Sequence, residues 1–213
     1  MTAGRGIAHS ELSLKETQRL HAVQLWVALP DADRNVAPAF EHRDDLPVVL
    51  GSDWKATVLV GEFLGQRAAT KAFSQMLGVE LRLEPNTEFR VPAVDGFEYG
   101  FLNVEGEFAA NGAEVPLSGL IYLSSGETGT EIVLNSGQSG ATLLILAGKP
   151  FGEPILMWWN FIARTNSEIS EMREQWNRHQ DDPAAAARFG TFSDHIGGWI
   201  PAPDLPNVQL RAR

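Results

Sequence analysis

The fold of the chain is clearest at residues 79–104, which read VELRLEPNTEFRVPAVDGFEYGFLNV. Two runs of strand-forming residues, 79–83 and 97–104, are separated by turn residues at Glu84-Pro85-Asn86 and Asp95-Gly96. Apolar runs bounded by proline, glycine, asparagine and aspartate in this way are typical of antiparallel β-structure. The stretch therefore predicts a succession of short strands joined by tight turns.

The same pattern extends over most of the 213 residues. Strand-like runs and turn signals alternate at a spacing of about 8 to 12 residues, which is expected of a β-sandwich or barrel. We therefore predict an all-β fold of the jelly-roll or cupin type. The other predicted strands are residues 21–29, 54–63, 119–123, 131–134, 142–147 and 154–163.

Helix is expected only near the end of the chain. Residues 165–168 read Thr-Asn-Ser-Glu, which has the spacing of a capping box, and apolar residues follow at helical intervals up to Trp176. Asp182-Pro183 has the chemistry of an N-cap and first helical position, and Gly190 that of a stop. We predict a helix of about three turns, a second short helix over 184–188 and an extended C-terminal tail.

Composition excludes several classes of protein. The sequence holds 27 acidic against 17 basic residues, a formal charge of −10, so it offers no basic stripe for a nucleic acid backbone. It has no cysteine, and hence no disulfide or thiolate ligand. No run approaches the roughly 20 apolar residues that span a bilayer. We expect a cytoplasmic protein that binds neither nucleic acid nor membrane.

The first eleven residues, MTAGRGIAHSE, hold the candidate metal ligands His9 and Glu11. Residues two apart on a strand point to the same face, so this imidazole and carboxylate can converge on one ion. Imidazole and carboxylate together suit non-heme iron. Arg5 could bind an anionic substrate or pair with a nearby carboxylate, and for a lone arginine the second is commoner.

These eleven residues closely resemble a segment of the pirin family of bicupins. The resemblance continues in order through four further stretches, and together they span residues 1 to about 190. Those stretches are 25–27 (LWV), 61–65 (GEFLG), 149–155 (KPFGEPI) and 188–190 (RFG).

The resemblance implies a two-cupin protein that binds Fe(II), with His9 and Glu11 as two of four ligands. In the family the other two come from a His-Pro-His motif upstream, and no His-x-His spacing occurs here. Met1 coincides with a methionine that is internal in the family, so we expect an N-terminally truncated chain whose first barrel is incomplete. A mis-assigned start codon and a real truncation would both produce this. The implied function is a quercetin 2,3-dioxygenase-like enzyme with a flavonoid-like substrate, or a redox-responsive regulator.

The acidic stretch from Pro30 to Pro47 is interpreted as a linker. We therefore expect three parts: a remnant of the first cupin with the linker over 1–46, the second cupin over 47–163, and helices and tail over 164–213. No histidine lies between Arg43 and Arg178, so the second cupin cannot hold a histidine-based metal site. Scattered glutamates there match the solvent faces of strands.

A hypothesis of another class is a metal-free interaction module, such as a transcription coregulator that binds a regulatory protein. The aromatic run at 155–161 could be a partner surface, although core packing between the two barrels is the commoner role of such a run. The remaining histidines are interpreted as packed or surface residues and not as catalytic groups: His21, His42, His179 and His195.

Overall fold

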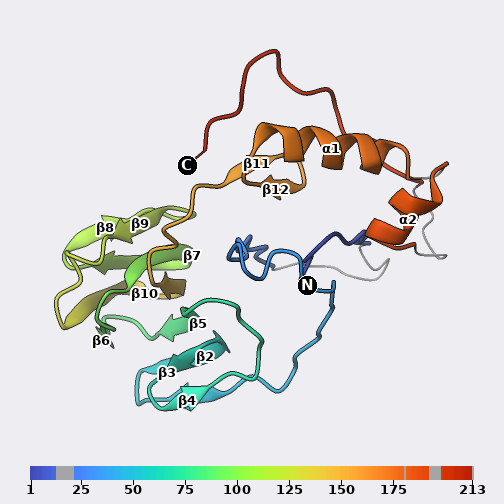
Figure 1. Cartoon of the computed structure of the whole chain (residues 1–213). Coiled ribbons are helices and arrows are strands. Elements are labelled where there is room, and N and C mark those ends of the chain that lie inside the picture. The colour runs from blue at the N-terminus through green and yellow to red at the C-terminus, as the bar shows by residue number, and fades with distance from the viewer. Residues whose placement is uncertain (13–21, 180, 192–197, 213) are drawn as a thin grey trace. The chain divides into compact units, whose positions relative to one another are not determined.

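The computed structural model describes residues 1–12, 22–179, 181–191 and 198–212 (Figure 1). The chain forms two compact units. The first contains Met1–Glu41 together with Gly152–Arg213, and the second is His42–Phe151. The division into domains at residues 46 and 163 stays a prediction. The two compact units are defined by contacts within the chain, and such contacts do not show where a cupin domain begins or ends.

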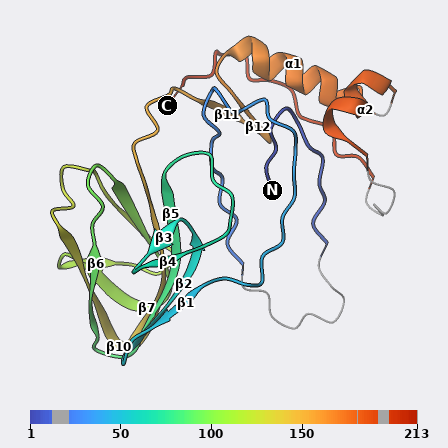
Figure 2. The same ribbon diagram turned by 60° about the horizontal axis from the view of Figure 1, so that its bottom comes forward.

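The second unit is built from antiparallel strands (Figures 1 and 2). An eight-stranded sheet has the order β1-β2-β5-β10-β7-β8, with β6 paired to β10 and β9 to β7, and β3 and β4 form a separate pair. The bounds are β1 Val48–Leu50, β2 Trp54–Val60, β3 Glu62–Phe63, β4 Gln66–Arg67, β5 Met76–Leu83, β6 Glu88–Pro92, β7 Glu98–Ala110, β8 Ala113–Val115, β9 Leu120–Leu123 and β10 Glu131–Gly148.

The long strand β10 pairs along its length with three others. Its first half pairs with β6 and the end of β7, and its second half with β5 and the start of β7. The register of β10 and β7 shifts between Ser136 and Ala141, where Gly106 and Gly140 have φ of 80° and 71°. A Cβ on Gly106 would lie 2.2 Å from the Gly140 carbonyl oxygen. This bulge bends the sheet because only glycine permits the close backbone approach.

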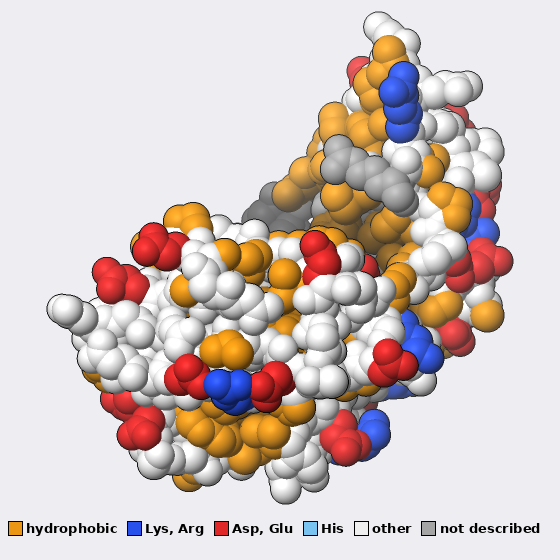
Figure 3. Space-filling view, turned by 90° about the vertical axis from the view of Figure 1, so that its left-hand side faces the viewer, with side chains coloured by type: hydrophobic (Ala, Val, Ile, Leu, Met, Phe, Trp, Pro, Cys, Tyr) orange, Lys and Arg blue, Asp and Glu red, His pale blue; other side chains and the backbone are white. Residues whose placement is uncertain are grey.

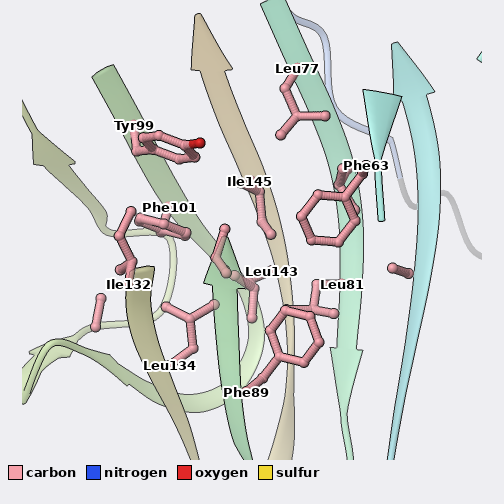
Figure 4. Close-up of a cluster of buried hydrophobic side chains, with 14 of the residues drawn as sticks. Phe63, Leu77, Leu81, Phe89, Tyr99, Phe101, Ile132, Leu134, Leu143 and Ile145 are labelled. Atoms are coloured by element: carbon pink, nitrogen blue, oxygen red, sulfur yellow. The ribbon is translucent and has the colours of Figure 1, made fainter. Parts of the chain in front are cut away.

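The interior of the second unit is apolar. Alternate residues of β5, β6, β7 and β10 are buried, and Figure 4 shows their side chains pointing toward one another between the strands. Phe101, Leu143 and Ile145 are fully buried. Alternating buried and exposed positions on antiparallel strands are the pattern of a sheet with one face packed on a core. The all-β prediction is confirmed.

The first unit contains a two-stranded hairpin, two helices and irregular chain (Figure 1). The predicted capping box is confirmed: Thr165 caps α1 and accepts from the Glu168 backbone N–H, while the Glu168 side chain accepts from the Thr165 N–H. Asp182 caps α2 with Pro183 in its first turn, and Gly190 ends it. The bounds are β11 Leu156–Trp158, β12 Phe161–Ala163, α1 Asn166–Asn177 and α2 Pro183–Phe189.

Two strand predictions are wrong in the first unit. Residues 22–29 form no strand, and the apolar side chains of Val23, Leu25, Trp26 and Val27 are exposed. A strand needs neighbours to satisfy its backbone groups, and the described residues supply none here. Residues 154–163 form a hairpin instead of one strand, because the chain turns at Trp159, whose φ is 51°.

Neither described helix is long and apolar enough to cross a membrane. On the face seen in Figure 3, acidic and basic side chains lie close to one another among hydrophobic ones. The ion pairs have this character, as where Arg90 lies between Glu88 and Glu131. Arginines neutralised in this way are poor contacts for a phosphate backbone.

Candidate functional site

The N-terminal loop that carries the predicted ligands is fixed to the rest of the first unit. Thr2 and Ala39 exchange backbone hydrogen bonds of 2.8 and 2.9 Å. The Ala8 N–H donates to the Phe189 carbonyl at the end of α2, over 2.6 Å. Gly4 has a φ of 53°, and a Cβ there would lie 2.1 Å from the Val36 carbonyl oxygen, so a larger residue would lift the loop away.

His9 and Glu11 lie close together, as the sequence predicts. The His9 Nε2 is 4.0 Å from the Glu11 Oε1, and their side chains are 46% and 73% exposed. Two ligand atoms that are each about 2.1 Å from one ion can be at most about 4.2 Å apart. The pair is therefore compatible with two coordination positions on a single metal ion.

Gln24 is a residue of this site that sequence reasoning missed. Its Nε2 donates a 3.0 Å hydrogen bond to the Glu11 Oε1, the same oxygen that lies 4.0 Å from the His9 Nε2, and so orients the carboxylate beside the imidazole. Hydrogen bonds to ligating carboxylates commonly tune metal affinity. The only sequence signal was an alternating pattern that predicted a strand, so the contact with Glu11 was not foreseen.

The described residues bring no third histidine, cysteine or acidic residue to His9 and Glu11, and contain no other group of three that could hold a metal ion. His42 is exposed, and His179 is buried against the Trp199 ring, with the ring centroids 3.9 Å apart. His21 and His195 lie outside the described residues. Within the second unit, the buried polar residues are Asn103, Thr128 and Ser136.

A polar network joins the segment after residue 29 to the helical region of the first unit. The Arg34 Nη2 donates to the Glu168 Oε1 over 2.8 Å, and the Arg164 Nη2 donates to Glu153 over 2.8 Å. The Asp31 N–H donates to the same Glu153 carboxylate. The first part of residues 30–47 is therefore held by ion pairs within the first unit, and the interpretation of the whole stretch as a linker stays a prediction.

These ion pairs shift the pKa values of both carboxyl groups. The Arg34 hydrogen bond is the main cause that lowers the pKa of Glu168 from 4.5 to about 2, against a smaller opposing effect of burial. The Arg164 hydrogen bond likewise lowers the pKa of Glu153. Both groups stay ionised at neutral pH, so the network is structural and not a source of catalytic protons.

The aromatic run at 155–161 packs inside the first unit. Leu156 and Phe161 are buried in a cluster with Ile169, and Trp158 and Trp159 cover that cluster. The run therefore packs within the first unit, and its predicted packing between two barrels stays a prediction, while Met157 remains 62% exposed.

The antiparallel sheet around an apolar core and the few short helices define an all-β cupin protein. Residues 78–181 match the family model described as the pirin C-terminal cupin domain. The chain belongs to the pirin family, as its N-terminal string predicted.

Individual relatives support this assignment over nearly the whole chain. A protein of Pseudomonas aeruginosa, provisionally named as a quercetin 2,3-dioxygenase, is 37% identical over 206 residues, which are 97% of this chain and 62% of the relative. Human pirin is 26% identical over 175 residues, 80% of this chain and 60% of the relative. The crystal structure of quercetin 2,3-dioxygenase from Acinetobacter baumannii superposes with a TM-score of 0.79 at 41% identity, covering 88% of this chain and 59% of that one. The chain thus spans about three fifths of the length of these three proteins.

Proposed function

We propose that this chain is part of a metal-dependent pirin with quercetin 2,3-dioxygenase-like activity toward a flavonoid-like substrate. The observation that carries the proposal is the likeness to the Acinetobacter baumannii quercetin 2,3-dioxygenase, at 41% identity and a TM-score of 0.79. The cofactor we propose is Fe(II), since an imidazole and a carboxylate that leave positions open suit non-heme iron.

In this proposal, His9 and Glu11 supply two of the iron ligands. The 4.0 Å between the His9 Nε2 and the Glu11 Oε1 allows both to reach one ion with small side-chain rotations. Gln24 holds the Glu11 carboxylate through its 3.0 Å hydrogen bond. When bound, iron supplies the redox chemistry that a dioxygenase needs. Among the described residues, no third histidine, cysteine or carboxylate joins this pair, so the proposal assigns two ligands only.

The test is metal content and activity in protein purified from its own cells, with the intact mass compared with 23.3 kDa. We expect iron in the wild-type protein and quercetin consumption that depends on it. His9→Ala and Glu11→Gln should lose most of the iron and most of the turnover. His42→Ala, which removes an exposed histidine, is the matched control and should lose neither. If both ligand variants keep the iron content of the wild type, the proposal is refuted.

A second candidate function is a metal-free interaction module that binds a regulatory protein. The observation that favours it is the exposed apolar run of Val23, Leu25, Trp26 and Val27, since contiguous exposed apolar residues commonly mark protein contacts. A ligand that binds only the folded protein raises its melting temperature. Fe(II) should therefore raise the melting temperature if the protein is a metal enzyme, and leave it unchanged if it is this module.

A further inference from the structure

A shallow surface cavity of about 400 Å³, open to solvent, lies in the first unit, and its lining does not include His9 or Glu11. Its lining brings together the N-terminal loop, the segment near residue 35 and both helices. Every charged group in the lining is an arginine. The lining residues are Arg5, Asn35, Gln175, Ala184, Ala185 and Arg188.

Arg188 is held in a fixed orientation at this cavity. Its Nε donates a 3.0 Å hydrogen bond to the Arg5 carbonyl oxygen, and its Nη1 donates to the Gln175 Oε1. Gln175 is itself fixed, because its Nε2 donates to the Glu171 carboxylate over 2.9 Å. The guanidinium therefore keeps donors for a ligand while its position is set by neutral acceptors.

Arg5, whose carbonyl oxygen accepts the hydrogen bond from Arg188, is the second arginine of the lining. Its backbone N–H donates to the Val36 carbonyl over 3.0 Å, so the loop places the side chain at the cavity. Among the described residues, no carboxylate forms an ion pair with Arg5 or Arg188. Other arginines of this acidic chain do pair with carboxylates: Arg34, Arg67, Arg82, Arg90, Arg164 and Arg173.

We infer that this cavity binds a small oxyanion, a carboxylate or a phosphate group. Guanidinium groups present planar pairs of donors that match the oxygens of these anions. Two arginines without a carboxylate partner, in a protein with a formal charge of −10, concentrate positive charge at one place. The amide of Asn35 can add a donor. The site needs neither iron nor the two proposed ligands, so it stands apart from the proposed function.

The test is an NMR titration of the metal-free protein with inorganic phosphate and, separately, with acetate, at constant ionic strength set by sodium chloride. We expect saturable shifts of the Arg188 Nε–H and of the Ala184 and Ala185 amides. Saturation by phosphate alone identifies a phosphate site, and saturation by acetate a carboxylate site. Shifts that never saturate, or that are spread evenly over the surface, overturn the inference.

Arg5→Gln is the decisive variant, because the Arg5 side chain makes no hydrogen bond to the described residues and its loss should not disturb the fold. It should weaken the anion affinity roughly tenfold, the effect of losing one charge-assisted hydrogen bond. Arg82→Gln removes the same charge on β5 of the second unit and should leave the affinity unchanged. Equal affinities in the wild type and Arg5→Gln would overturn the inference.

Discussion

Replacing Glu168 by glutamine tests whether the ion pair with Arg34 stabilises the first unit. Glutamine keeps an acceptor for the capping box but removes the charge that faces Arg34. The pKa of Glu168 is about 2 instead of 4.5, which corresponds by linkage to about 3 kcal/mol of stability at neutral pH. Because the side chain is 31% exposed, solvent screening reduces this to about 1–2 kcal/mol.

The sign of the pH dependence follows from the lowered pKa. The stabilisation is fully present above about pH 4.5, the ordinary pKa of this carboxyl group, and is lost as the pH falls towards about 2. The wild type should therefore be more stable than Glu168→Gln at pH 7, and the difference should shrink below pH 4.5.

Urea unfolding followed by tryptophan fluorescence measures this difference in the relevant unit, because every tryptophan except Trp54 lies in the first unit. Glu171→Gln is the matched control, since Glu171 is an exposed residue of the same helix that accepts only from Gln175 among the described residues. The reasoning is refuted if the two variants lose the same stability at pH 7, or if the Glu168→Gln deficit does not depend on pH.

Three further substitutions test other parts of the fold. Leu143→Ala opens a cavity at a fully buried position and should cost about 2–5 kcal/mol in urea unfolding followed by far-UV circular dichroism. Gly106→Ala should cost more than about 1 kcal/mol in the same assay, because its φ is 80° and the new Cβ would lie 2.2 Å from the Gly140 carbonyl oxygen; a stabilised variant would contradict the bulge. Thr165→Ala removes the cap of α1 and should cost about 0.5–2 kcal/mol by tryptophan fluorescence, whereas Thr165→Ser should restore most of it.

Short sequence motifs correctly predicted those helix ends whose hydrogen bonds join residues close together in the sequence. The capping box needs only Thr165 and Glu168, three residues apart, and both helices begin and end as predicted to within a residue or two. The prediction failed at residues 21–29, whose described part forms no strand. Alternation of side chains says which face a strand would bury, but not whether a neighbour exists to pair with it.

Some residues of the candidate sites could likewise be identified from the sequence, and others only from the structure. His9 and Glu11 could be named from the sequence, because two residues on an extended segment meet without help from elsewhere. Gln24 could not, since it reaches Glu11 from thirteen positions away. The cavity with Arg5 and Arg188 depends on residues 183 positions apart, and no local pattern specifies such a contact.

The sequence by itself determined the β-rich class, the helix termini, the family and the His9–Glu11 pair, because each depends on hydrogen bonds, turns or a string of residues that are local. Tertiary structure alone decided the ion pair of Arg34 with Glu168, the core packing of the 155–161 run and the cavity between the N-terminal loop and the helices. Those features join segments that are distant in the chain. Which residues contact each other there depends on the surfaces that the whole fold brings together. The burial of apolar surface and the pairing of charges over the whole unit stabilise these contacts.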